Sequence, residues 1–170
     1  MSVVIRSETP GDAAQIRTVN ERAFGRRAEA DLADALRGRG AHAISLVAEQ
    51  DKRLVGHVLF TPLTLESGGR QFAALGLAPI AVLPELQNQG IGAQLVTYGI
   101  VECRQAGYEC VLVLGRPDYY ARFGFVSASR YGLRCEYDVP EEAFMALELY
   151  RGALVGSSGR VRYPPEFRQV

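Results

Sequence analysis

One segment near the middle of the chain limits the possible folds more than any other. An apolar run from Leu77 to Leu83 ends at Pro84, and a short polar turn follows. Gly90 and Gly92 then open an apolar segment with helical periodicity. Glycines let a backbone approach a ligand closely, and the first N–H groups of a helix have no internal partner. Together with the positive end of the helix dipole, these groups favour a phosphate or pyrophosphate.

The glycine spacing alone leaves two interpretations open. A dinucleotide fingerprint needs a third glycine, but Leu95 stands in that position. A nucleoside-triphosphate loop needs Gly-Lys-Ser/Thr, which the sequence lacks. Because glycine pairs also occur at strand-to-helix turns for structural reasons, an anion cradle and a simple turn are about equally supported by this segment.

Length and charge limit the class of protein. A chain of 170 residues fits one domain, here residues 1–170. Its 19 basic and 19 acidic residues give a net charge of zero, so no global field attracts nucleic acid or an anionic membrane. The N-terminus has no signal-peptide pattern, and no apolar run is long enough to span a bilayer. We expect neither a nucleic-acid partner nor a membrane.

The cysteines argue against a metal site. There are three, with no Cys-x-x-Cys spacing, so neither a zinc site nor a disulfide framework is expected. Cys103 and Cys110 lie in apolar runs and are predicted to be buried as small hydrophobic residues. Free thiols without a signal peptide predict a cytoplasmic protein.

Hydrophobic periodicity predicts alternating helices and strands. Helices are expected from Asp12, as the cap, to Gly25, from Ala28 to Leu36, from Gly90 to Ala106 and from Pro117 to Phe123. Strands are expected over Val3–Ile5, Ile44–Glu49, Leu54–Leu65, Gln71–Val82, Glu109–Leu114, Val126–Tyr137, Phe144–Leu149 and Val161–Tyr163. Glycines in Ser67–Arg70 predict a hairpin turn and hence an antiparallel meander of the second to fourth strands. The strand–helix–strand unit over 77–114 predicts a parallel crossover.

Pro79 falls inside one of these strands. Proline has no N–H and cannot serve the middle of a sheet ladder. Two interpretations are equally supported. The strand lies at an edge or carries a bulge, or it parts from a neighbour here and leaves backbone groups free for a ligand.

A second motif follows the buried strand 109–114. It reads Gly115-Arg116-Pro117-Asp118-Tyr119-Tyr120-Ala121-Arg122-Phe123-Gly124-Phe125. Aromatic clusters mostly pack in cores, but this one offers two phenols next to the predicted cradle.

With these two motifs the chain resembles the GNAT superfamily, the Gcn5-related N-acetyltransferases that use acetyl-coenzyme A. The loop Gln87-Asn88-Gln89-Gly90-Ile91-Gly92 is similar to the family's Arg/Gln-x-x-Gly-x-Gly/Ala pyrophosphate loop. The segment from Tyr120 to Phe125 is similar to its Tyr-x-x-x-Gly-Phe segment. The tandem tyrosines before Arg-Phe-Gly-Phe resemble a bacterial subgroup of predicted acetyltransferases.

The resemblance implies an α/β (α+β) GNAT fold. Its central sheet is mixed, mostly antiparallel and flanked by helices, with a V-shaped splay between the fourth and fifth strands. In the family, the pantetheine arm of the cofactor pairs with the fourth strand like an added strand. Ile80, Ala81 and Val82 are therefore expected to contact it. Near the splay, the missing N–H of Pro79 would have no sheet partner to serve.

Acetyl-CoA, or coenzyme A, is the implied co-substrate, and no metal is expected. The residues expected around its pyrophosphate are Gln87, Asn88, Gln89, Gly90, Ile91, Gly92 and Ala93. Many family loops carry Lys or Arg before the first glycine, where this chain has Gln89. Arg122, or less readily Arg116, is a candidate for the adenosine phosphate, although a solvated surface role stays open. Tyr119 is expected to pack against the cofactor or the core, and Phe123 beside the cofactor.

By resemblance, Tyr120 is the general acid that protonates the departing thiolate. A phenol with an ordinary pKa of about 10 stays protonated at neutral pH, and a backbone N–H near Val82 is placed to stabilise the oxyanion. No general base is evident. Glu21 and Glu29 on the helices that border the acceptor site, a water molecule, or an acceptor that arrives deprotonated all stay open. His42 and His57 have no surrounding pattern and are interpreted as structural or surface residues.

The predicted reaction is direct transfer of acetyl from acetyl-CoA to a primary amine of a small molecule or peptide. Two alternatives are a non-catalytic acyl-CoA-binding or regulatory module, and a transferase for a longer acyl group. Homodimers are frequent in the family, so a homodimer is compatible with the resemblance. Neither its interface nor the acceptor is identified by the sequence.

Overall fold

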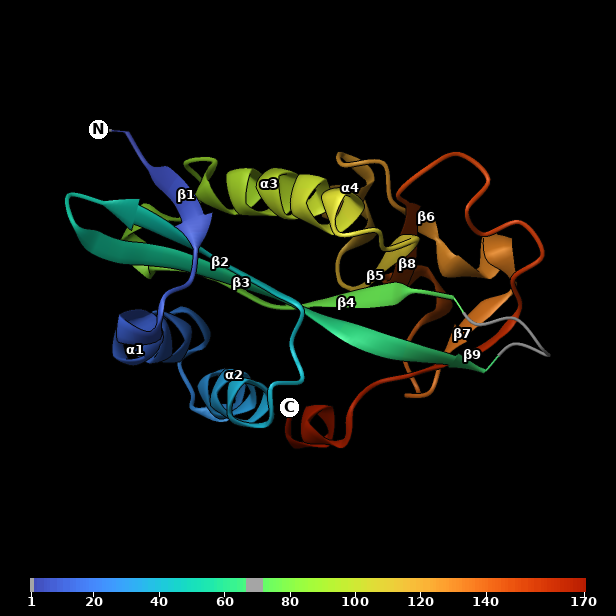
Figure 1. The fold of residues 1–170 in the computed structure, drawn as a ribbon, viewed down its shortest axis with the longest axis horizontal. Helices are drawn as coiled ribbons and strands as arrows, with labels where there is room; N and C mark the ends of the chain where they lie inside the picture. The colour runs from blue at the N-terminus through green and yellow to red at the C-terminus, as the bar shows by residue number, and fades with distance from the viewer. Residues whose placement is uncertain (1, 67–71) are drawn as a thin grey trace. The chain divides into compact units, whose positions relative to one another are not determined.

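The computed structural model describes residues 2–66 and 72–170 (Figure 1). The hairpin turn predicted at Ser67–Arg70 and the first residue of the strand predicted from Gln71 lie outside these residues. The helices are α1 (Ala13–Phe24), α2 (Ala28–Arg39), α3 (Ile91–Gln105) and α4 (Pro117–Ala121). The strands are β1 (Val4–Ser7), β2 (Ile44–Gln50), β3 (Arg53–Glu66), β4 (Ala74–Val82), β5 (Cys110–Leu114), β6 (Val126–Ser127), β7 (Leu133–Cys135), β8 (Phe144–Glu148) and β9 (Gly159–Arg162). Short 3-10 turns are η1 (Pro10–Asp12), η2 (Pro84–Leu86), η3 (Ala128–Tyr131), η4 (Glu141–Ala143) and η5 (Pro165–Gln169).

The strands form a mixed sheet. Their hydrogen-bonded order is β1-β2-β3-β4-β5-β8-β6, with β9 paired to β3 and β7. The β1–β2 and β2–β3 pairs are antiparallel. The β2–β3 pair confirms the first half of the predicted meander, and the parallel β4–β5 pair confirms the predicted crossover. The described β4–β5 register ends at Gly76 opposite Leu112, although β4 continues to Val82.

The chain packs as two compact units. The first contains Met1–Thr61, Ala78–Gly99 and Pro165–Val170, and the second contains Pro62–Leu77 and Ile100–Pro164. Strands β3 and β4 and helix α3 therefore contribute residues to both units.

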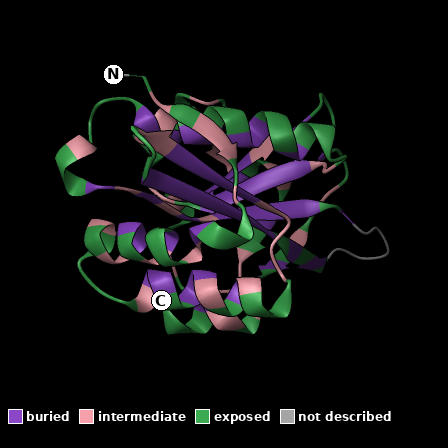
Figure 2. Ribbon diagram, turned by 60° about the vertical axis from the view of Figure 1, so that its left-hand side comes forward, coloured by how far each residue is buried: buried purple, intermediate pink, exposed green. Residues whose placement is uncertain are grey.

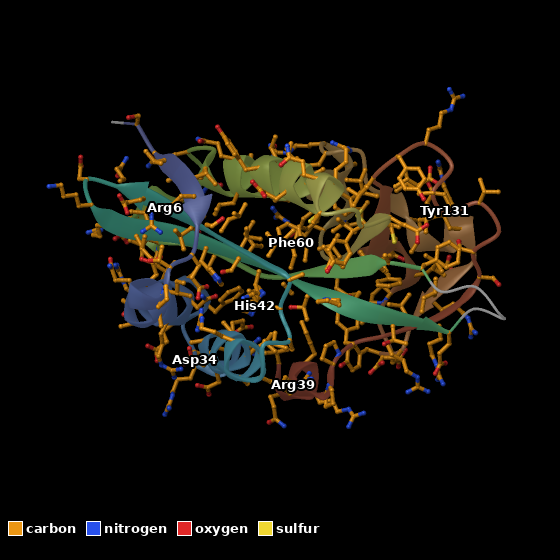
Figure 3. All side chains as sticks on the ribbon, in the orientation of Figure 1. Arg6, Asp34, Arg39, His42, Phe60 and Tyr131 are labelled. Carbon is orange, nitrogen blue, oxygen red and sulfur yellow. The ribbon has the colours of Figure 1, made fainter. Side chains whose placement is uncertain are left out.

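In the first unit, helices cover both faces of the β1–β2–β3 strands. Helices α1 and α2 lie on one face, and the first half of α3 lies on the other (Figure 1). The alternation of β3 shows this: His57 contacts Asn20 of α1 at 3.2 Å, whereas Phe60, which is labelled in Figure 3, packs against Gly99 of α3. Buried residues concentrate on the strands, and each helix exposes one side (Figure 2). The core of this unit therefore has two apolar layers around the sheet.

The start of α1 differs from the prediction. Asp12 precedes the helix, but its carboxylate does not cap α1. It accepts the N–H of Thr9 at 2.7 Å and pairs with Arg6 of β1 at 2.8 Å (Figure 3). The Asp12 carboxylate binds Arg6 instead of capping α1 because the guanidinium is a charged hydrogen-bond donor, and the first turn of α1 has none. Gly25 ends the helix with φ 66°, as predicted.

In the second unit, β5 lies between β4 and β8, and its first four residues are buried. The strand predicted over Val126–Tyr137 is wrong as a single element, because β6 pairs with β8 while β7 pairs with β9. Between them the chain makes the η3 turn, which ends at Gly132 with a φ of 72°. The predicted strand Phe144–Leu149 is confirmed as β8, and the last strand begins earlier than predicted, at Gly159.

Across residues 2–66 and 72–170, no helix has the length and apolarity needed to span a membrane.

Candidate active site

Within the residues that the structure describes, β4 continues to Val82 beyond Gly76, its last residue paired with β5. Leu83 donates its N–H to the carbonyl of Val55 in β3 at 2.9 Å. Because backbone groups alternate sides along a strand, the N–H groups of Val82 and Ile80 point away from β3. Both belong to the three residues, Ile80, Ala81 and Val82, that were expected to contact pantetheine. Ala81, between them, is 3% exposed and anchors the strand in the core.

Pro79 lies in the second half of β4. The same alternation directs its nitrogen toward β3, the side to which Leu83 donates. The missing N–H therefore removes a potential donor to β3 and does not explain a gap on the other side. The Ala78–Pro79 peptide bond is cis.

A short turn then leads from β4 to α3. The side-chain amide of Gln87 donates to the carbonyl of Val82 at 3.0 Å, which ties the exposed loop back to the strand. Asn88 and Gly90 take positive φ values of 62° and 88°. A Cβ at Gly90 would meet nothing within 4 Å, so its role is backbone conformation rather than space.

The loop presents a row of free backbone donors. Gln94 donates its N–H to the carbonyl of Gly90 at 3.0 Å, which is the first such bond after the turn. Within the described part of the chain, the N–H groups from Asn88 to Ala93 donate to no protein acceptor. Ile91 is 3% exposed and anchors the start of α3 while its neighbours stay accessible. This geometry is that of an anion site at a helix N-terminus.

Glu85 brings two cations next to this row. Its carboxylate accepts both terminal nitrogens of Arg22, at 3.0 and 2.8 Å, and lies 3.4 Å from Arg53. A backbone hydrogen bond and the Arg22 guanidinium lower the pKa of this exposed carboxyl. Glu85 is therefore ion-paired rather than simply solvated. No local sequence signal links it to the two arginines, since they lie 63 and 32 positions away in the chain.

Tyr120 lies on α4 in the second unit. Pro117 starts this short helix, and the Tyr120 side chain is buried, with 7% of its surface exposed. Its ring packs edge-on against Tyr119 and Phe125, with ring centroids 5.0 and 5.6 Å apart. Burial raises the pKa of its phenol to about 12, and the neighbouring Tyr119 acts in the same direction.

Tyr119, Arg122 and Phe123 form one small cluster beside it. The Arg122 guanidinium lies 4.6 Å from the centre of the Tyr119 ring and 5.3 Å from that of Phe123. The tyrosine and phenylalanine are half-buried, whereas Arg122 is exposed. This stacking holds the Arg122 charge against an aromatic surface. The side chains of Tyr119, Arg122 and Phe123 in the second predicted motif therefore pack against one another.

The candidate bases differ in their surroundings. Glu29 is buried and pairs with Arg26, whereas the more exposed Glu21 lies 3.6 Å from Arg17. His57 is fully buried, and burial lowers its pKa to about 3. It is a structural histidine, in line with the prediction. His42 is half-buried, and no described group hydrogen-bonds its Nδ1.

Cys103 and Cys110 are free thiols and fully buried, as predicted. Among the residues that the structure describes, no group of three or more His, Cys, Asp or Glu side chains is arranged to hold a metal ion.

The fold and the two motifs define the class of protein. The family model described as "Acetyltransferase (GNAT) domain" matches residues 4–128. The chain therefore belongs to the GNAT family of acetyltransferases, as the sequence predicts.

Individual relatives agree with this assignment. The Escherichia coli K12 protein called "Uncharacterized N-acetyltransferase YhbS" is 37% identical over 168 residues, which cover 98% of this chain and 99% of the relative. A second protein of that strain, "Uncharacterized N-acetyltransferase YjhQ", is 42% identical over 134 residues, covering 77% and 74%.

Two crystal structures have similar folds. That of Escherichia coli YhbS in complex with CoA matches with a TM-score of 0.93 at 37% identity, over 98% of this chain and 92% of the other. That of a GNAT family acetyltransferase from Brucella melitensis in complex with acetyl-CoA matches with a TM-score of 0.81 at 35% identity, over 98% of both chains.

Proposed function

We propose that this protein transfers the acetyl group of acetyl-CoA to a primary amine of a small molecule or peptide. The observation that carries the proposal is the row of N–H groups from Asn88 to Ala93, which have no described protein acceptor. Free donors at a helix N-terminus suit the pyrophosphate of coenzyme A. The CoA and acetyl-CoA bound in the two similar crystal structures support the same co-substrate.

The strand before the cradle is assigned to the rest of the cofactor. The N–H groups of Ile80 and Val82 point away from β3, so they are available to the amide groups of a pantetheine arm. Ala81 keeps the strand anchored. An N–H near Val82 is also our candidate donor for the oxyanion of the tetrahedral intermediate. Tyr119, Arg122 and Phe123 are proposed to contact the cofactor as one cluster.

The reaction needs one bond to form and one to break. The neutral amine nitrogen attacks the thioester carbon to form the C–N bond, and the C–S bond then breaks to release coenzyme A as its thiolate. We assign the protonation of that thiolate to Tyr120. With a pKa of about 12, its phenol holds its proton at neutral pH but is a weaker acid than a thiol, whose ordinary pKa is about 8.5. Proton donation must therefore be coupled to loss of a proton from the attacking nitrogen, which restores the phenol.

Titration calorimetry with coenzyme A tests the cradle. One-to-one binding is expected, and no detectable heat at millimolar ligand would contradict the proposal. Acetyl transfer is followed by thiol release with a panel of primary amines. Binding without release for any amine would favour a non-catalytic acyl-CoA-binding module, and release only from longer acyl-CoA donors would favour a different acyl specificity.

A Tyr120→Phe variant tests the general acid. It is expected to bind coenzyme A normally and to lose about 10² to 10⁴ in turnover, because only the hydroxyl is removed. Tyr98→Phe, at an exposed tyrosine of α3, is the matched control and is expected to retain turnover. Normal turnover of Tyr120→Phe would remove Tyr120 from this role. A single domain over residues 1–170, a cytoplasmic location and a homodimer remain predictions.

A further inference from the structure

We infer that Gly115 is a positioning residue for the hydroxyl of Tyr120. Gly115 follows β5 directly and precedes α4, both in the second unit. The ring of Tyr120 occupies the space that any side chain at position 115 would need. The inference rests on the proposed function, because it concerns the placement of the proposed general acid.

Space, rather than backbone conformation, explains the glycine. Gly115 is not among the residues with positive φ, so its backbone is open to any amino acid. A Cβ built there would lie 2.3 Å from Cε2 and 2.8 Å from Cδ2 of Tyr120. Both distances are far shorter than an ordinary van der Waals contact between carbon atoms, about 3.5 to 4.0 Å. Gly124, at the other end of the motif, differs because its φ of 97° is itself the reason for glycine.

Neither partner is free to move away. Gly115 donates its N–H to the carbonyl of Ala143 at 3.0 Å, next to the paired strands β5 and β8. The backbone N–H of Tyr120 bonds the carbonyl of Arg116 at 3.2 Å, and its ring is enclosed by the rings of Tyr119 and Phe125. A methyl group at position 115 must therefore displace the phenol ring.

The expected displacement is large enough to affect catalysis. Restoring an ordinary contact from 2.3 Å requires a shift of the ring by about 1 Å, and the hydroxyl at the far end of the ring moves with it. A misplacement of about 1 Å can cost about 10²-fold in rate. Gly115→Ala is therefore expected to lower kcat by about 10- to 100-fold. Coenzyme A affinity should stay within about twofold, because the cradle donors from Asn88 to Ala93 are untouched.

Two other glycines supply matched controls. Gly99 of α3 is in the same position relative to a ring, since its Cβ would lie 2.4 Å from Cε1 and Cζ of Phe60. Gly99→Ala thus overpacks a ring outside the proposed site and should reduce stability while kcat is kept. Gly38 has nothing within 4 Å of its Cβ position, so Gly38→Ala should change neither quantity.

The decisive experiment is a double-mutant cycle on kcat with Gly115→Ala and Tyr120→Phe. If Gly115 acts through the hydroxyl, adding Gly115→Ala to Tyr120→Phe should cost less than about threefold. Full activity of Gly115→Ala, or the same loss in both backgrounds, would overturn the inference. Full activity of Tyr120→Phe would instead contradict the proposed function, so the two failures are distinguishable.

An equilibrium measurement covers the case in which Gly115→Ala is too unstable to assay. Tyr120→Leu removes the ring that meets the new methyl group. In that background, Gly115→Ala should no longer lower the midpoint of denaturant unfolding. A midpoint that falls equally in both backgrounds would show that the clash is not with Tyr120, and the inference would be wrong.

Discussion

Burial of His57 predicts that the protein loses stability as the pH falls from 8 to 5. The imidazole is fully buried in the first unit. Its Nδ1 lies 3.2 Å from the side-chain nitrogen of Asn20, and its Nε2 lies 3.1 Å from the hydroxyl of Ser45. An amide nitrogen only donates, so Nδ1 must accept and the proton must be on Nε2. The site therefore holds the neutral ring.

The electrostatic surroundings set the direction of the effect. Burial lowers the pKa of His57 from 6.5 to about 3, while Glu8 opposes this and Arg37 and His42 reinforce it. Because the folded pKa is depressed for a base, the stabilisation is complete above pH 6.5. It is lost as the pH falls, since the unfolded chain takes up a proton that the folded chain does not.

Linkage gives the magnitude. Between pH 8 and pH 5, the free energy of unfolding should fall by about 2 kcal/mol at 25 °C. The figure is nearly the same for any folded pKa well below 5, because the unfolded imidazole determines the proton uptake. Burial raises the pKa of Glu8, but hydrogen bonds from Arg37 and Ser45 outweigh it and lower the pKa overall. Glu8 therefore titrates below this pH window and adds little within it.

The assay is urea unfolding, followed by circular dichroism at half-unit pH steps from 8 to 5. His57→Gln removes the titrating group. Between pH 8 and pH 5, the fall in the unfolding free energy of this variant should therefore be about 2 kcal/mol smaller than the fall in the wild type. An unchanged pH dependence in His57→Gln would refute the assignment of the effect to this imidazole.

Three further outcomes are expected. Gly99→Ala should destabilise the fold by about 1–3 kcal/mol in denaturant melts, because the ring of Phe60 lies 2.4 Å from the new methyl group, and combining it with Phe60→Leu should recover part of the loss. Burial raises the pKa of both Cys103 and Cys110 to about 12, so a thiol reagent at pH 8 should modify them only after unfolding. Glu85→Gln should tighten coenzyme A binding by about two- to fivefold at low salt, because it frees both arginine partners beside the cradle. Weaker binding of this variant would contradict that sign.

Local sequence signals predicted most of the elements. Periodicity and glycine placement predicted the end of α1 at Gly25 and the strands β2, β5 and β8. Both signals depend only on residues that are close together in the sequence. The strand predicted across Val126–Tyr137 failed because β6 and β7 pair with different strands. Alternating hydrophobicity indicates that one face of a strand is buried. It does not indicate with which other strand that strand pairs.

The candidate site divides in the same way. The loop Gln87–Ala93 and the segment Tyr119–Phe125 are contiguous, so their backbone geometry is a local property that the sequence could predict. The ion pairs of Glu85, the depressed pKa of His57 and the ring of Tyr120 over Gly115 join residues distant in the chain or packed across elements.

The sequence by itself determined the family, the order of the elements and the turn with glycines before α3, because each depends on short-range patterns of glycine and apolar residues. Only the tertiary structure decided which side of β4 carries the free N–H groups and why position 115 lacks a side chain. Hydrogen-bond direction and excluded volume are properties of atoms in space. Residues far apart in the chain, or separated by a turn, meet only when the chain folds.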